Sequence, residues 1–216
     1  MRRFTVVNAP QRSADWFAAR LGRVTASRAK DMLATIKSGE AAARRDYRFE
    51  LVCERLTGQS AEDAYVTTDM QRGLDLEADA FAAYEARTGV LADRVGFCAH
   101  TEILAGGSPD GVIGDFTGLL EIKAPRPANH LRYLRSGTLP KEHEAQVTHL
   151  LWLTGAEWLD FLSYSPVFPP HLQTMLVRVE AKYLDLEHYE RQVRTFLEDV
   201  ELELAGLRGW SVLEIA

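Results

Sequence analysis

Two short charged segments constrain the fold of this 216-residue chain more than any other feature of its sequence: Ser108-Pro-Asp110 and Glu121-Ile-Lys123. Each lies beside a short run of β-forming residues, and a Gly-containing stretch at 114–118 separates the two runs. This pattern predicts a β-hairpin, with the Pro-Asp turn before its first strand and the Glu-Ile-Lys triplet on its second strand.

The hairpin is expected to bring acidic and basic side chains together. Side chains at positions i and i+2 of a strand lie on the same face, so Glu121 and Lys123 point together. Leu120 and Ile122 then point to the opposite face, where they can be buried. The hairpin also brings Asp110 back beside the Glu-Lys pair, so that two carboxylates and one ammonium group converge.

Two carboxylates at such a short separation need a compensating charge. At ~4 Å and an effective dielectric constant of ~20, they repel each other by about 4 kcal/mol. Lys123, a divalent cation, or both would offset this repulsion. Mg2+ or Mn2+ suits the oxygen ligands, because no cysteine and no suitably spaced histidine is near. An exposed hairpin with ordinary surface charges is the alternative, and the complete motif with its apolar flanks favours a functional site.

The rest of the chain alternates between helical and strand-like periodicity. Helices are expected at Trp16–Leu21, Arg28–Ile36, Tyr47–Thr57, Asp69–Arg87, Lys141–Thr154 and 183–205, and further strands at Trp158–Tyr164 and Gln173–Glu180. No repeat or linker divides the sequence, so residues 1–216 are expected to form a single domain. Helices before and after a strand-rich centre predict an α/β fold with a central mixed β-sheet flanked by helices.

The composition limits the class of protein. Hydrophobic residues make up 46% of the chain and charged residues 26%, which is typical of a globular domain. No apolar run is long enough to span a membrane and no signal peptide is apparent, so the expected location is the cytoplasm. Cys53 and Cys98 are too few and too far apart for a disulfide scaffold or a four-cysteine metal site.

The charge is unevenly distributed along the chain. The net charge is −6, but residues 1–50 contain 11 Lys and Arg against 5 Asp and Glu. A basic segment on an acidic body suits local binding of an anionic ligand, and a solvated helix face explains it equally well.

The charged motif resembles that of the Pro-Asp…(Asp/Glu)-x-Lys nuclease superfamily, whose members share a restriction-endonuclease-like core. Further blocks narrow the resemblance: Trp16…Arg20-Leu-Gly22…Ser27, then Arg72-Gly73…Glu77, and downstream Glu144-Ala-Gln146-Val-Thr-His149. In this order and spacing, the blocks are similar to the bacteriophage lambda exonuclease family, also called YqaJ-like viral recombinases, over about residues 14–165.

The resemblance implies a catalytic centre whose members are Asp110, Glu121, Lys123, Glu77 and Gln146. The implied ligands of two Mg2+ ions, for which Mn2+ could substitute, are Asp110, Glu121, Glu77 and the backbone carbonyl of Ile122. From the residues alone, Glu77 is not distinguishable from the other acids of its helix. Gln146 would orient the water or a scissile oxygen, and a buried structural hydrogen bond is the alternative.

The resemblance also implies contacts with DNA by Arg20, Ser27, Ser108 and Lys37, and the position of Met70 two turns before Glu77 suggests a further contact. Arg20, Ser27 and Ser108 would bind a terminal 5′-phosphate, aided by free N–H groups at the start of the helix that Ser27 opens. Lys37 stands where the family has an arginine, and it keeps the charge without the bidentate geometry. Met70 could wedge between terminal base pairs, or simply pack in the core. His143 and His149 are expected at a helix surface rather than as ligands.

The function implied by the resemblance is a Mg2+-dependent exonuclease that degrades the 5′-ended strand of double-stranded DNA and leaves 3′ single strand. The family also implies a ring-shaped homotrimer and a single-strand annealing protein as partner. Another nuclease of the superfamily, such as a structure-specific endonuclease, remains an alternative. A DNA-end-binding module with a silent site is disfavoured because all the charged positions are filled. An unrelated metal-binding enzyme would leave the basic N-terminal segment unexplained.

Overall fold

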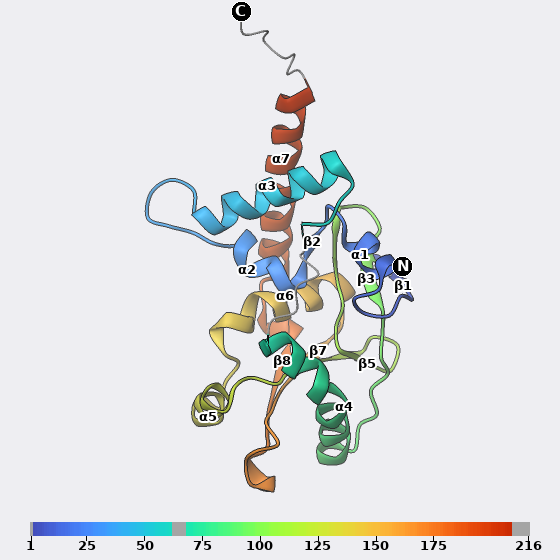
Figure 1. The fold of residues 1–216 in the computed structure, drawn as a ribbon, viewed down its shortest axis with the longest axis vertical. Helices are drawn as coiled ribbons and strands as arrows, with labels where there is room; N and C mark the ends of the chain where they lie inside the picture. Colours follow the sequence, from blue (N-terminus) through green and yellow to red (C-terminus); the bar gives the residue numbers. More distant parts are fainter. Residues whose placement is uncertain (1, 62–67, 209–216) are drawn as a thin grey trace, which may run out of the picture.

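The computed structural model describes residues 2–61 and 68–208, which form two four-stranded sheets and the helices around them (Figure 1). The strands are β1 (Phe4–Val7), β2 (Val24–Thr25), β3 (Phe97–His100), β4 (Ala105–Gly107), β5 (Gly111–Ile113), β6 (Gly118–Lys123), β7 (Trp158–Tyr164) and β8 (Thr174–Glu180). The helices are α1 (Ala14–Arg20), α2 (Ala29–Met32), α3 (Ala42–Thr57), α4 (Thr68–Thr88), α5 (Pro127–Ser136), α6 (Lys141–Thr154) and α7 (Leu186–Arg208). Short 3-10 turns occupy Ala26–Arg28, Pro170–Leu172 and Ala181–Tyr183.

The expected mixed sheet is present, but as two sheets rather than one. The order of the first is β1-β3-β4-β2 and that of the second is β5-β6-β7-β8. In the second sheet β6 pairs antiparallel with β5 and parallel with β7, which confirms the predicted hairpin. Gly118 begins β6 directly against the Trp158 ring, where an added Cβ would lie 2.3 Å from a ring carbon. Only glycine fits that position without displacing the ring.

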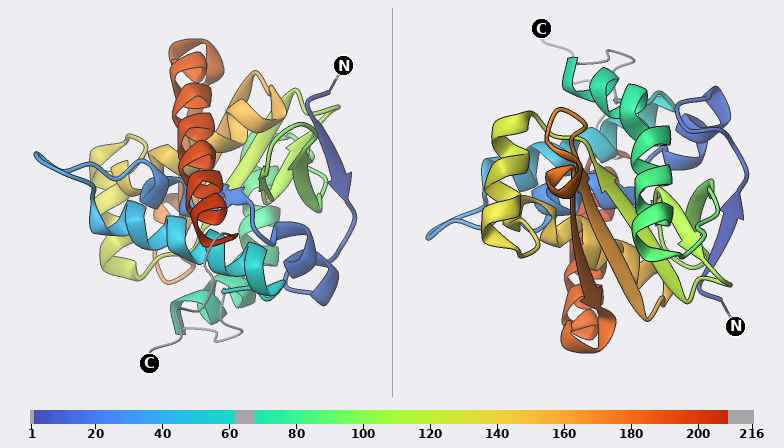
Figure 2. Two further views of the ribbon diagram at one scale, coloured as in Figure 1. Left: turned by 90° about the horizontal axis from the view of Figure 1, so that it is seen from above. Right: turned by 90° about the horizontal axis from the view of Figure 1, so that it is seen from below.

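Helices cover both faces of the second sheet, and this burial fixes which way the side chains of β6 point. Leu120 and Ile122 are buried in a cluster with Ala80 and Tyr84 of α4. Val147, Leu150 and Leu151 of α6 pack with Leu119 and Phe161 from the other face, in a cluster of their own. The predicted alternation along β6 is therefore confirmed. The right-hand view of Figure 2 shows the strands of this sheet between α4 and α5.

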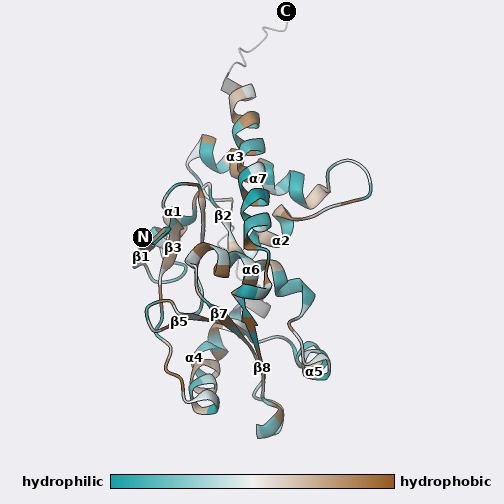
Figure 3. Cartoon of the chain, turned by 180° about the vertical axis from the view of Figure 1, so that it is seen from behind, coloured by the Kyte–Doolittle hydropathy of each residue, from teal (hydrophilic) through white to brown (hydrophobic). Residues whose placement is uncertain are grey.

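Helix α7 packs against α3 and α6 and completes a second part of the core. Its apolar side chains Tyr189, Val193, Phe196 and Val200 are buried together with Tyr47 of α3. Hydrophilic and hydrophobic residues alternate around this helix (Figure 3), as expected for a helix with one buried face. The helix ends three residues later than predicted, at Arg208. No helix within residues 2–61 and 68–208 combines the length and apolar content that crossing a membrane requires.

The helix predicted at Arg28–Ile36 is the main correction to the fold. The helical segment is only Ala29–Met32, preceded by the 3-10 turn Ala26–Arg28. Neither Thr25 nor Ser27 caps it, because Thr25 makes no side-chain cap hydrogen bond and Ser27 lies inside the turn. A helix this short has only a small dipole with which to attract an anion. The expected help of its N-terminal N–H groups in binding a 5′-phosphate is therefore lost.

Candidate active site

One cleft with a volume of about 800 Å3 collects most of the residues that the sequence singles out. Its lining includes Asp110, Glu121, Ile122, Lys123, Glu77, Gln146, Arg20, Ser27 and Ser108. Lys37 is not among the lining residues; it is exposed in the segment after α2. The backbone of Met70 lies in the first turn of α4, but its side chain is outside what the structure describes, so the wedge stays a prediction.

The carboxylate of Glu121 is the centre of the polar contacts in this cleft. Glu121 is 1% exposed, and its Oε1 accepts hydrogen bonds from Lys123 Nζ at 2.6 Å and from Gln146 Nε2 at 2.5 Å. Burial alone would lower the pKa of Lys123, but Glu121 and Asp110 outweigh it and raise the pKa. The ammonium group therefore stays charged at neutral pH.

Asp110 lies beside this pair, as the hairpin predicts. Its Oδ2 accepts a hydrogen bond of 2.6 Å from the backbone N–H of Ile122. Burial, followed by the negative charge of Glu121, raises the pKa of Asp110 to about 8, although Lys123 and the Ile122 N–H act in the opposite direction. Two acids that resist simultaneous ionisation and face one cleft are a feature of active sites.

The donor set suits a hard divalent cation. Oε2 of Glu121 is buried and has no hydrogen-bond partner among the described residues. Such an orphaned carboxylate oxygen costs free energy unless a cation or a proton compensates it. With the Asp110 carboxyl and the Ile122 carbonyl nearby, the ligands are oxygens, which Mg2+ and Mn2+ prefer. The residues present therefore fit such an ion.

Glu77 is held differently from the other two acids. It lines the cleft from α4, and its Oε1 forms an ion pair with Nη1 of Arg94. Among residues 2–61 and 68–208, no group of three or more His, Cys, Asp or Glu side chains stands ready to hold a metal ion. The buried Tyr84 hydroxyl of α4 donates a hydrogen bond of 2.9 Å to Asp160 of β7. This contact holds α4, the helix that carries Glu77, against the second sheet.

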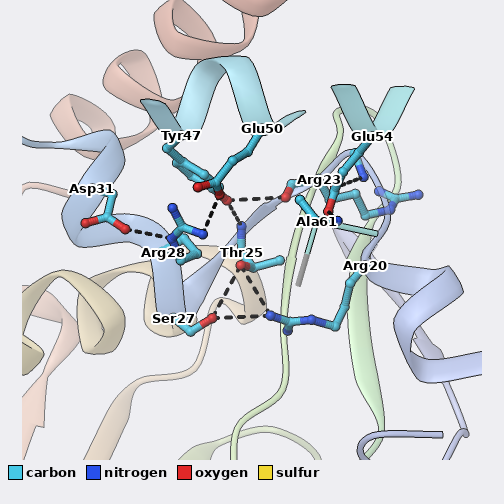
Figure 4. A network of polar contacts seen from close by, with 11 residues as sticks. Arg20, Arg23, Thr25, Ser27, Arg28, Asp31, Tyr47, Glu50, Glu54 and Ala61 are labelled. Atoms are coloured by element: carbon cyan, nitrogen blue, oxygen red, sulfur yellow. Dashed lines mark hydrogen bonds and ion pairs between the residues drawn. The ribbon is translucent and has the colours of Figure 1, made fainter. Parts of the chain in front are cut away.

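Arg20 and Ser27 lie together at another part of the cleft. Nη2 of Arg20 donates to Ser27 Oγ at 3.3 Å and to Thr25 Oγ1 at 3.5 Å (Figure 4). The guanidinium stacks 4.1 Å from the centre of the Trp16 ring, and Trp16 Nε1 donates to Ser108 Oγ at 3.1 Å. One aromatic side chain thus links Arg20 to Ser108, so the structure brings these three residues together.

Helix α3 fixes the backbone that carries Arg20 and Ser27. The Tyr47 hydroxyl accepts a hydrogen bond of 3.0 Å from the Thr25 N–H and donates to the Arg23 carbonyl at 3.4 Å (Figure 4). Burial raises the pKa of Tyr47 to about 12, so this phenol stays protonated. Tyr47 is therefore a positioning residue that the sequence motif does not reveal.

Many charges of the basic N-terminal segment are already compensated. Arg28 pairs with Asp31 and Glu50 at 2.6 Å each, and Arg44 with Asp199 at 2.6 Å. These arginines tie the helices to one another, and Arg28 also lines the cleft. The segment is thus partly scaffold, and its basic residues that line the cleft are Arg12, Arg20 and Arg28.

His143 and Tyr133, which sequence reasoning did not assign to the site, also line the cleft. Burial of His143, followed by the charge of Lys123, lowers its pKa to about 4. Its Nε2 lies 3.3 Å from the Tyr133 hydroxyl, which donates to Glu142 at 2.8 Å.

The prediction that His149 lies at the helix surface is wrong: it is fully buried, with Nδ1 2.8 Å from the Tyr189 hydroxyl of α7.

Comparisons with known proteins show which family and fold this chain shares. The family model for the YqaJ-like viral recombinase domain matches residues 15–157. The alkaline exonuclease LHK-Exo from Laribacter hongkongensis is 38% identical, with a TM-score of 0.81 over 91% of this chain and 96% of its own. The same enzyme solved in complex with dAMP gives a TM-score of 0.82 at the same identity and coverage.

A more distant structure shares the fold alone. A phage-related exonuclease from Haemophilus somnus 129PT is 13% identical, with a TM-score of 0.65 over 86% of this chain and 96% of its own. No curated protein matches the sequence significantly. The α/β architecture is thus the restriction-endonuclease-like fold expected from the motif. Because the family model covers well over half of the sequence, this chain belongs to the YqaJ-like viral recombinase family.

Proposed function

We propose that this chain is a Mg2+-dependent 5′-to-3′ exonuclease that acts on double-stranded DNA and leaves 3′ overhangs for recombination by strand annealing. The observation that carries the proposal is the convergence of Asp110, Lys123 and Gln146 around the buried carboxylate of Glu121. Family membership and the names of the related exonucleases support a nuclease of this kind.

Two Mg2+ ions, or Mn2+ in their place, are part of the proposal. Asp110, Glu121 and the Ile122 carbonyl would hold one ion, and Glu77 would contribute to a second. When bound, such ions supply Lewis-acid stabilisation of the charge that develops on a scissile phosphate. The orphaned Oε2 of Glu121 supports this assignment.

The charged and amide side chains of the cleft have separate tasks. Lys123 stays protonated and would orient the attacking water or neutralise charge on the phosphate. Gln146 donates its amide to Oε1 of Glu121, which fixes the carboxylate and leaves Oε2 available. Substitution of either residue should therefore lower turnover more than it lowers the affinity for DNA.

The other part of the cleft would bind the end of the DNA. Arg20, Ser27 and Ser108 offer a guanidinium and two hydroxyls to a terminal 5′-phosphate. A charge-assisted pair of this type contributes roughly 1.5–3 kcal/mol. Lys37, outside the cleft, would contact the duplex at a distance from the reacting bond, and Met70 would separate the terminal base pair.

The assembly is also a proposal. A ring-shaped homotrimer that encircles the product strand, and a single-strand annealing protein that receives this strand, agree with the family; a cytoplasmic location suits both. Light scattering of the purified protein tests the ring, because a monomer at micromolar concentration would contradict it.

Digestion of a linear duplex labelled at either its 5′ or its 3′ ends tests the activity. With Mg2+, the 5′ label should be released first as mononucleotide, and the 3′ label should stay on long fragments. EDTA and the Glu121→Gln variant should each stop the release. Release of the 3′ label first, or internal cleavage of a circular duplex, would contradict the proposed polarity.

A further inference from the structure

We infer that Arg94 is a counter-ion of Glu77 which a divalent cation must displace, so that this arginine sets the cation affinity of the cleft. The inference rests on the proposed function, since it concerns the acid assigned there to the second ion. It assigns Arg94 a regulatory role that the charged motif does not indicate.

The Arg94 guanidinium lies along one side of α4. Its Nη1 donates to Oε1 of Glu77, and its Cζ lies 5.2 Å from the centre of the Phe81 ring, one turn further along the helix. The backbone next to it is held in place, because Asp93 and Val112 exchange two hydrogen bonds of 2.8 Å. Val112 lies on β5, so Arg94 is tied to the hairpin that carries the catalytic acids.

The charges of the cleft explain why Glu77 needs a partner there. Asp110, Glu121 and Glu77 are three acids, and Glu77 adds to the repulsion that Asp110 experiences. Lys123 forms its ion pair with Glu121, at 2.6 Å. Arg94 supplies the cation on this side by forming an ion pair with Glu77.

The exposure of the two side chains indicates a pair that exchanges readily. The Arg94 side chain is 58% exposed, whereas that of Glu77 is only 19% exposed. Exposed ion pairs of this type change an equilibrium constant by only about two- to fivefold. A divalent cation can therefore displace Arg94 from Glu77. The displaced guanidinium would stay at the rim of the cleft, where it would be able to bind a DNA phosphate.

Mn2+ binding to the full-length chain tests the inference without any need for turnover. Free Mn2+ is followed by electron paramagnetic resonance during titration of wild type, Arg94→Gln, Glu77→Gln and the double variant. Arg94→Gln should tighten Mn2+ binding at the second site, to which Glu77 contributes, by about two- to fivefold. It should have no effect in the Glu77→Gln background, because the displaced contact is already absent there.

Two control variants separate the ion pair from a general effect of charge. Arg12 lines the same cleft, so Arg12→Gln removes an equal charge without touching Glu77. Arg94→Lys keeps the charge and should shift affinity less than Arg94→Gln does. Circular dichroism and the melting temperature establish that each variant is folded.

The outcomes distinguish this inference from the proposed function. An effect of Arg94→Gln that persists without Glu77, or that Arg12→Gln reproduces, would overturn the role of Arg94. If Glu77→Gln weakens Mn2+ binding while Arg94→Gln changes nothing, the inference fails and the proposed function stands. If wild type binds no Mn2+, the proposed metal centre fails as well.

Discussion

Replacing Asp110 with asparagine should stabilise the protein when no divalent cation is bound. The amide side chain that Asp110→Asn introduces retains an oxygen that accepts the hydrogen bond from the Ile122 N–H. It has no negative charge, so the repulsion from Glu121 disappears. An active-site substitution is thus expected to raise the free energy of unfolding while it abolishes catalysis.

The magnitude follows from the pKa of Asp110, which rises from 3.8 to about 8 in the folded protein. The folded state binds this proton more tightly than the unfolded state, so wild type loses stability as the pH rises between these two values. The loss is up to about 1.4 kcal/mol per pH unit, or about 4 kcal/mol at pH 7. The carboxyl is partly exposed, and solvent reduces this figure to about 2–4 kcal/mol.

Urea denaturation in EDTA at pH 5, 6, 7 and 8 measures the effect. The stability advantage of Asp110→Asn over wild type should grow steadily with pH, from about 1–2 kcal/mol at pH 5. Asp115→Asn is the matched control, because Asp115 lies in the turn of the same hairpin with an 89% exposed side chain. Loss of its ion pair with Arg2 should cost less than about 1 kcal/mol.

Addition of Mg2+ should narrow the difference between the two proteins. Wild type gains stability from binding the ion, and Asp110→Asn lacks one of the ligands. An advantage that is independent of pH, or a variant less stable than wild type at pH 8, would refute the reasoning about the coupled acids.

Four further substitutions test other parts of the account. Lys123→Ala should retain Mn2+ and DNA binding yet lose about 100-fold or more in kcat, and equal losses in both binding assays would make the residue structural. Arg20→Ala should remove most of the preference for 5′-phosphorylated over 5′-hydroxyl ends, about 10- to 100-fold in kcat/KM; an intact preference would place the phosphate elsewhere. Met70→Ala should slow digestion of a blunt duplex but spare a frayed end, and equal slowing on both would exclude a wedge. Gly118→Ala should lower stability by about 1–3 kcal/mol in urea denaturation, because its Cβ meets the Trp158 ring, and an unchanged midpoint would show that the ring moves freely.

Elements with strong local signals are the ones that the sequence predicts well. Helix α6 begins and ends as predicted, and it stops at Gly155 in the left-handed conformation with φ of 70°. Strand β7 likewise has its predicted bounds. The first sheet carries no such signal, because β1 and β3 have four residues each and depend on pairing between distant segments. The helix expected at Arg28–Ile36 ends at Met32, whose carbonyl accepts a hydrogen bond of 3.0 Å from Nη1 of Arg44 on α3, a contact between distant segments.

The residues of the candidate site likewise fall into those that local sequence predicts and those that depend on contacts between distant segments. Asp110, Glu121 and Lys123 could be predicted to converge because a single hairpin carries all three. Gln146 required the family resemblance, since its contact with Glu121 depends on how α6 packs on the sheet. The burial of His149 could not be predicted, because the residue that covers it, Tyr189, is forty positions away on α7.

The central claim is that Asp110 and Glu121 form the metal centre of a nuclease. Anomalous scattering from crystals of the full chain soaked in Mn2+ tests this claim most directly. We expect an anomalous peak between the Asp110 carboxyl and Oε2 of Glu121, and no such peak in crystals of Asp110→Asn. A strong peak elsewhere, with none at these two carboxylates in an active protein, would contradict the account.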